Sequence, residues 1–156
     1  MKTITTKVYT LDELAEEAKE KAREWYRQGM TFPEERGDWI IEDVKEIGKL
    51  MGIDVRNVYC SGFSCQGDGA CFEGFYIYRK QGAKKVKEYA PEDRELHRIA
   101  EALQAEQHNH FYCLEASVGH SGHYYHEYCT DIHVFKCGVP WDDEPITTLL
   151  RDFMHW

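Results

Sequence analysis

The amino-acid sequence predicts an α+β fold, in which a mainly antiparallel four-stranded sheet made of two hairpins carries three to four packed helices. Two observations lead to this prediction. The spacing of apolar residues changes from the helical period of about 3.6 to the strand period of about 2 after Gly52, and it changes again after a helical pattern at residues 91–108. The length of 156 residues, with 42% apolar and 30% charged residues, suits one domain over residues 1–156.

The N-terminal third predicts two helices. The first spans residues 11–28, where the apolar residues lie on one helical face. Thr10 and Glu13 have the spacing of a capping box, which is typical of a helix N-terminus. The second helix spans residues 38–51 and ends before Gly52.

The first hairpin is predicted at residues 55–78, with its strands joined by a glycine-rich turn at residues 66–69. This register places Phe63 opposite Phe72. Both faces are then partly apolar, so the hairpin is either covered on both sides or binds something on one side. One face would carry Val58, Cys60, Cys71, Phe75 and Ile77, and the other Tyr59, Phe63, Phe72, Tyr76 and Tyr78.

Residues 79–90 form the one concentrated basic stretch of an acidic chain and are predicted as a solvated loop or a short helix. A helix at 91–108 follows, with Pro91 in its first turn. The chain ends with a short helix at 145–154, where apolar residues again share one face.

The second hairpin is predicted at residues 111–135, with a turn at residues 119–122. A two-residue loop at Ser121 and Gly122 would place His120 opposite His123, and Val118 opposite Tyr125. A shift of one residue would reverse these faces, and both registers stay open.

The charge balance limits the classes of partner. The chain has 19 Lys+Arg and 28 Asp+Glu, which gives a net charge of −9. That charge disfavours a general nucleic-acid binder and is compatible with a partner protein that has a basic surface. The sequence contains no apolar run of membrane-spanning length and no secretory leader pattern, so we expect a cytoplasmic protein whose six cysteines are buried thiols.

A local concentration of imidazoles is the strongest metal-binding candidate, namely His120, His123, His126 and Cys129. On a strand, however, His123 and His126 would point to opposite faces. We therefore expect exposed or hydrogen-bonded histidines, with no metal and no cofactor. A metal- or ligand-dependent enzyme that uses the His120–His133 region stays open as an alternative.

Patterns for other chemistry are weak. The sequence contains no nucleophile elbow of the Gly-x-Ser-x-Gly type. Gly67-Asp68-Gly69 joins two strands and lacks the Lys-Ser/Thr of a phosphate-binding loop. We therefore expect no catalytic residue, and the sequence favours a protein that is not an enzyme.

A protein-binding surface is the remaining candidate. Carboxylates on the first helix could meet a basic surface, while residues of the first hairpin and of the Tyr124-Tyr125 pair could supply aromatic contacts. The residues that we expect to bind a partner are Asp12, Glu16, Glu17, Glu20, Gln66, Asp68, Phe63, Phe72, Tyr76, Tyr124 and Tyr125.

The stretch Ser61–Gly74, which reads SGFSCQGDGACFEG, is the most specific motif in the chain. Together with the first helix and with Gly122–His126, it resembles a family of small proteins from phages and bacterial prophages. Members often carry the label of antitoxin of a toxin–antitoxin stability system by automatic transfer. The resemblance covers roughly residues 9–135 and brings no catalytic residues with it.

This resemblance implies a phage or prophage accessory protein that works in the cytosol of a bacterial host. The expected function is to bind and inhibit a host protein, chiefly a defence or nucleic-acid-handling complex, in the manner of an anti-CRISPR protein. The alternative within the same resemblance is an antitoxin that neutralises a cognate toxin.

Overall fold

The computed structural model describes residues 9–29, 34–61 and 68–156. The chain divides into two units, residues 1–38 and 39–156, and each is described by itself. Whether they fold as the one domain that the sequence predicts stays a prediction. No helix in the described ranges is long and apolar enough to cross a membrane.

The first unit differs from the single helix predicted at residues 11–28. Thr10 and Glu13 do form a capping box, but it closes the one-turn 3-10 helix η1, Leu11–Glu13. Leu14 is then extended, with φ −80° and ψ 147°, so the helical run is interrupted. The α-helix α1 begins only at Glu16 and covers Glu16–Gly29. The cap was predicted correctly from the sequence, but the helix that begins at this cap is a single turn.

The second unit contains a five-stranded sheet in the order β1-β2-β3-β4-β5, with every neighbouring pair antiparallel. The α+β class is therefore confirmed, and the sheet has one strand more than the predicted four. The strands are β1 Ile53–Cys60, β2 Ala70–Ile77, β3 Leu114–His120, β4 Thr130–Lys136 and β5 Val139–Trp141. The three-residue edge strand β5 was missed because it is short and contains Pro140, which is tolerated at a sheet edge.

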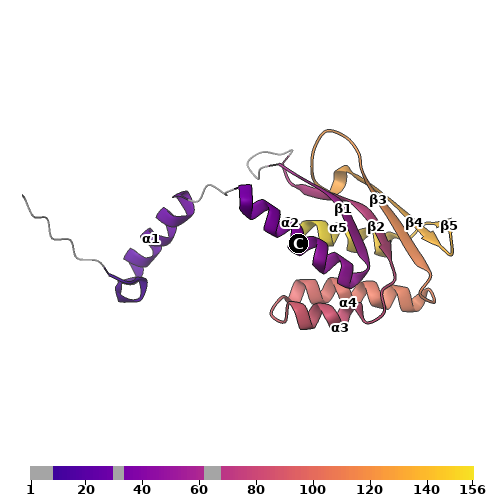
Figure 1. Ribbon diagram of the computed structural model, residues 1–156, viewed down its shortest axis with the longest axis horizontal. Coiled ribbons are helices and arrows are strands. Elements are labelled where there is room, and N and C mark those ends of the chain that lie inside the picture. Colours follow the sequence, from indigo (N-terminus) through magenta and orange to yellow (C-terminus); the bar gives the residue numbers. More distant parts are fainter. Residues whose placement is uncertain (1–8, 30–33, 62–67) are drawn as a thin grey trace, which may run out of the picture. The chain divides into compact units, whose positions relative to one another are not determined.

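The helices of the second unit lie close to their predicted positions. The basic stretch at 79–90 contains a short helix, which packs beside the next helix of the chain (Figure 1). Asp93 and Asp143 cap the two C-terminal helices by accepting the backbone N–H of Leu96 and Ile146, each at 2.9 Å. The bounds are α2 Glu34–Met51, which begins in the first unit, α3 Gly82–Tyr89, α4 Arg94–Asn109 and α5 Glu144–His155.

One face of the sheet is covered by the hydrophobic core, because alternate residues of the strands are buried against the helices. On β2, Phe72 and Tyr76 are buried while Phe75 and Ile77 are exposed. The helices contribute apolar residues such as Ile47, Val86, Leu103 and Leu150 to the same core. The opposite face of the sheet, called the outer face below, carries exposed side chains such as Phe75 and Ile77, and the candidate functional site lies there.

The predicted register of the first hairpin is wrong. Phe72 pairs with Val58 rather than with Phe63, which lies outside the described residues. A β-bulge between Val55 and Asn57 shifts the alternation by one residue, so Val55 and Val58 both face the core. The predicted face that grouped Val58 with Cys71, Phe75 and Ile77 is corrected accordingly, since Val58 shares a face with Phe72 and Tyr76.

The second hairpin does not have the tight turn predicted at residues 119–122. His120 pairs with Thr130 and Val118 pairs with Ile132, so His123 and Tyr125 lie in a loop and not in a strand. This loop, residues 121–129, ends in the 3-10 helix η2, Glu127–Cys129. Its aromatic residues were read as strand residues, but they pack against other rings instead of pairing with β3.

The expectation that the cysteines are buried thiols holds for Cys71 only among the five that the structure describes. Cys60 and Cys137 are exposed, while Cys113 and Cys129 are half-buried. The exposed pair lies at the end of β1 and in the turn after β4.

Candidate functional site

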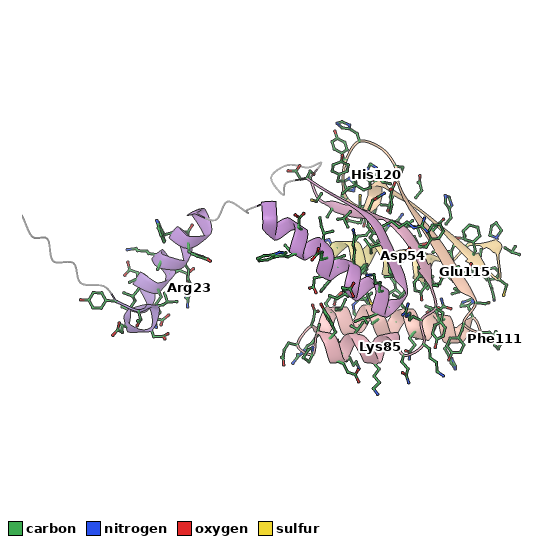
Figure 2. All side chains as sticks on the ribbon, in the orientation of Figure 1. Arg23, Asp54, Lys85, Phe111, Glu115 and His120 are labelled. Atoms are coloured by element: carbon green, nitrogen blue, oxygen red, sulfur yellow. The ribbon has the colours of Figure 1, made fainter. Side chains whose placement is uncertain are left out.

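The outer face of the sheet is hollowed into a groove of about 450 Å³. Its residues come from four neighbouring strands, β1 to β4. They are Arg56, Asn57, Glu73, Gly74, Phe75, Ser117, Val118, Gly119, His120, Asp131 and His133. Figure 2 shows Asp54, Glu115 and His120, which lie on β1 and β3, and Lys85 on α3, at the other side of this unit.

The bulge in β1 positions the basic side chain of the groove. Because one extra residue is inserted between Val55 and Asn57, Arg56 turns to the outer face together with Asn57. The guanidinium lies 4.5 Å from the centre of the Phe75 ring, in a cation–π contact. Arg56 also contacts Asp54, with 3.4 Å between Nε and Oδ2.

The Glu73 carboxylate accepts three hydrogen bonds in the groove. Its Oε2 accepts hydrogen bonds of 2.9 Å from the Asn57 amide and from the Tyr59 hydroxyl. Its Oε1 accepts the backbone N–H of His120 at 3.3 Å. These hydrogen bonds lower the pKa of Glu73 below its ordinary value, and the one from Asn57 has the largest effect. The hydrogen bond between Tyr59 and Glu73 raises the pKa of Tyr59. Glu73 is therefore a fixed carboxylate that joins β1, β2 and β3.

Three rings gather at one end of the groove. The Tyr59 ring lies 4.9 Å from the His120 ring and stacks on Tyr125 at 5.5 Å. His120 and Tyr125 are 5.3 Å apart, and Nε2 of His120 lies 3.2 Å from the backbone oxygen of Tyr124. The loop at 121–129 is thereby held against the sheet, with Tyr124 exposed at its surface. The rings form an aromatic wall at this end of the groove.

The outer face is acidic. Along β1 to β4 it carries four carboxylates, Asp54, Glu73, Glu115 and Asp131, against the single guanidinium of Arg56. Phe75 and Ile77 are 44% and 53% exposed on the same face. Apolar anchors beside an excess of carboxylates suit a partner that offers basic and apolar groups.

The structure separates the residues that the sequence grouped as partner-binding. Phe72 and Tyr76 are core residues, 3% and 1% exposed, so the prediction that they contact a partner is wrong. Burial of Tyr76 raises its pKa to about 12. The alternation left open which face is buried, and in the structure the helices pack against the face that carries Phe72 and Tyr76. Phe63 and Gln66 lie outside the described residues, and Asp68 lies at the described end of the same connection.

The predicted carboxylates of the first helix belong to the first unit. Glu16 pairs with Lys19 at 2.8 Å, and Glu17 pairs with Lys21 at 2.9 Å. The remaining members are Asp12, on η1, and Glu20, which contacts Arg23 at 3.1 Å. Because basic residues follow these glutamates at helical spacing, the acidic face of α1 is partly neutralised locally.

Of the predicted metal ligands, only one pair is in contact. Nε2 of His126 lies 3.4 Å from Sγ of Cys129, while Nδ1 of His126 accepts the backbone N–H of Tyr128. His120 packs in the aromatic wall, and His123 packs against Tyr124. Within residues 9–29, 34–61 and 68–156, no group of three or more His, Cys, Asp or Glu side chains is arranged to hold a metal ion.

Several groove residues were not singled out by sequence reasoning, above all Arg56, Glu73 and Asp131, whereas His133 was named as the end of the His120–His133 region. The alternation of Glu73, Phe75 and Ile77 on β2 was a usable signal, since a charged residue in an otherwise apolar strand points away from the core. The role of Arg56 had no such signal, because the bulge depends on pairing with β2.

A family model described as a domain of unknown function, DUF8835, matches residues 37–156. The chain belongs to the DUF8835 family. The matched region contains the whole sheet and the groove, and it begins within two residues of the second unit. No curated protein and no solved structure matches the chain. The groove is thus a feature of the DUF8835 domain itself, whereas η1 and α1 precede that domain.

Glu73 makes the stability of this domain depend on pH. Its pKa is lower in the folded than in the unfolded chain, so its stabilising effect is present above the unfolded pKa and is lost as pH falls through the folded pKa. We expect Glu73→Gln to lower the free energy of unfolding at neutral pH, and the difference from the wild type to shrink under acidic conditions. Urea unfolding at a series of pH values measures this, with Glu115→Gln as the control on the same face. A difference that stays constant with pH would contradict the role of Glu73.

Proposed function

We propose that the protein binds another protein through the groove on the outer face of its sheet and inhibits it. The observation that carries this proposal is the acidic outer face of the sheet, where Phe75 and Ile77 are exposed in the described part of the second unit. Exposed apolar side chains surrounded by polar ones are typical of interaction sites. Phe75, beside Arg56, is the central anchor of this surface.

The charges of the groove favour a basic partner. Asp131 and Glu115 are exposed, and neither belongs to the fixed cluster around Glu73. Carboxylates at the rim of an interface increase the rate of association with a basic surface and weaken binding as salt rises. A protein surface that normally holds nucleic acid has the required positive charge.

The resemblance of the SGFxxQGDGAxFxG motif to phage and prophage proteins supports the biological setting of the proposal. In that setting the target is a host defence or nucleic-acid-handling complex, whose basic surface is occupied in place of the nucleic acid. An antitoxin that binds a cognate toxin uses the same kind of surface and is the alternative. Competition with nucleic acid separates the two whenever the toxin does not itself bind nucleic acid.

The test begins with affinity capture from a bacterial lysate by the wild type, Phe75→Ala and Asp131→Lys. A protein that the wild type captures is purified for titration with the wild type and both variants. We expect Phe75→Ala to weaken its binding by at least about tenfold, and Asp131→Lys to weaken it most at low salt.

Glu92→Lys is the matched charge control, because Glu92 is exposed between α3 and α4 and not on the sheet. It should bind like the wild type, and a nucleic-acid duplex added in excess should displace the protein from its partner. Binding that is indifferent to salt and to both groove variants would refute the proposal. Binding that needs the groove but is unaffected by nucleic acid would favour the antitoxin.

One observation favours a second candidate, a ligand-dependent enzyme. His120, His133, Glu73 and Asp131 line the same groove, and these residue types carry general acid–base catalysis. Glu73, however, also has a structural role, since its carboxylate accepts three hydrogen bonds. If no protein partner depends on Phe75, screening small polar ligands by the chemical shifts of His133 is the experiment for this candidate.

A further inference from the structure

Two cysteines lie directly opposite each other beyond the ends of β3 and β4. Cys113 immediately precedes β3 and Cys137 immediately follows β4, and the register that pairs Leu114 with Lys136 brings them together. The backbone N–H of Cys137 donates to the oxygen of Cys113 at 3.0 Å. The Cys113 thiol donates to the backbone oxygen of His110 at 3.1 Å. A side-chain hydrogen bond with Cys113 raises the pKa of Cys137.

The backbone around this pair is strained. Cys137 has φ +51° and Gly138 has φ +79°, so they form a two-residue hairpin turn in which both central residues are left-handed. Asn, Asp or Gly is usual at the first of these positions, and a cysteine there is unfavourable. On the other side of the pair, Phe111 and Tyr112 have φ +56° and +61°. Thus three of the four non-glycine left-handed residues of the described chain lie next to or within the pair.

The geometry of opposite residues in an antiparallel ladder suits a disulfide. In such a ladder, opposite Cα atoms are about 4.5–5.5 Å apart, within the range of about 4.4–6.8 Å that a disulfide spans. Cys113 and Cys137 continue this ladder by one position, and a backbone hydrogen bond joins them. Cys137 is exposed and Cys113 is half-buried, so a reagent reaches the pair from the Cys137 side. Cys71, in contrast, is buried, and burial raises its pKa to about 11.

We propose that Cys113 and Cys137 are a modification site, a dithiol that closes reversibly to a disulfide and joins the α4–β3 turn to the β4–β5 hairpin. The oxidant is a small-molecule disulfide such as oxidised glutathione. The Cys137 thiolate attacks one sulfur of glutathione disulfide and releases one glutathione thiolate, which takes up a proton. The Cys113 thiolate then displaces the second glutathione from Cys137. Two protein thiols are oxidised and one glutathione disulfide is reduced to two glutathione molecules.

The test uses the full, reduced chain with oxidised glutathione at about pH 9, because an ordinary thiol ionises near about pH 8.5 and the pKa of Cys137 is raised. The reaction is quenched with acid, and the remaining thiols are alkylated under denaturing conditions. The sequence has six cysteines, so closing one disulfide leaves 6 − 2 = 4 to be alkylated. Peptide mass spectrometry should show Cys113 linked to Cys137, and dithiothreitol should restore six alkylated thiols. A glutathione adduct that persists on Cys137, or linkage mainly among other cysteines, would overturn the proposal.

Three variants complete the test. Cys113→Ser and Cys137→Ser should each keep glutathione on the remaining cysteine without forming the internal disulfide. Cys60→Ser removes another exposed cysteine, at the end of β1, and should close the disulfide like the wild type. The disulfide form should have a melting temperature about 5–10 °C above that of the reduced form. A lower melting temperature for the disulfide form would show that the native backbone does not fit this bond, and would overturn the proposal. The wild-type mapping decides the matter even if a serine variant fails to fold.

Discussion

Gly74→Ala is expected to destabilise the DUF8835 domain by at least about 3 kcal/mol, because the strand opposite leaves no room for a side chain. A Cβ atom at residue 74 would lie 2.0 Å from the backbone oxygen of Asp54. Backbone atoms of a paired strand cannot turn aside as a flexible side chain can. To relieve the contact, β1 would have to move away from β2, next to the bulge that positions Arg56. Urea unfolding followed by circular dichroism measures the loss.

Gly119→Ala is the matched control for this substitution. Gly119 lines the same groove, but a Cβ there would meet nothing within 4 Å. The alanine should leave the free energy of unfolding unchanged or raise it by about 0.4–1 kcal/mol, because it restricts the unfolded chain. If Gly74→Ala unfolded at the same urea concentration as the wild type, the close approach of β1 and β2 would not constrain the sheet.

Gln107→Leu is expected to cost about 3–5 kcal/mol of unfolding free energy, since it leaves two buried backbone groups without partners. Gln107 is fully buried on α4. Its amide donates to the oxygen of Leu114 at 2.7 Å and accepts the Leu114 N–H at 3.2 Å. The side chain thereby binds the first residue of β3 to the helix that precedes it. Leucine has a similar size, so the effect isolates the hydrogen bonds from the packing.

Gln104→Leu, one turn earlier on the same helix, is the control for Gln107→Leu. Gln104 is exposed, so its replacement should change stability by no more than about 0.5 kcal/mol. Hydrogen exchange supplies a second measurement, because the Leu114 amide should exchange faster in Gln107→Leu than in the control. Equal stability of the two variants would show that the Leu114 backbone finds other partners.

The helices and most strands could be predicted from local patterns. The spacing of apolar residues located α4. The acidic N-cap of α5 is another local signal, because the capping side chain and the helix are neighbours along the chain. The interruption at Leu14 was missed, because the capping pattern of Thr10 and Glu13 is equally compatible with a single 3-10 turn and with a long helix. Local patterns therefore located elements better than their ends.

The candidate site was predicted only in part. Tyr124 and Tyr125 were predicted to contact a partner, which stays a prediction. In the structure Tyr125 stacks on Tyr59 beside the groove. Phe72 and Tyr76 were assigned to the wrong face, because a period of two does not say which face is buried. The pairing of β1 with β2 had to be known before Arg56 and Glu73 could be recognised as neighbours across the groove.

The sequence by itself determined the α+β class, the order of most helices and strands, and the acidic net charge. These properties depend on residues that are close along the chain or on simple composition. The tertiary structure decided which face of the sheet the core covers, how Arg56 is turned onto Phe75 by the bulge, and that Cys113 lies opposite Cys137. Each of these depends on strand register, which is set by contacts between segments far apart in the sequence, and a shift of one residue would reverse the faces.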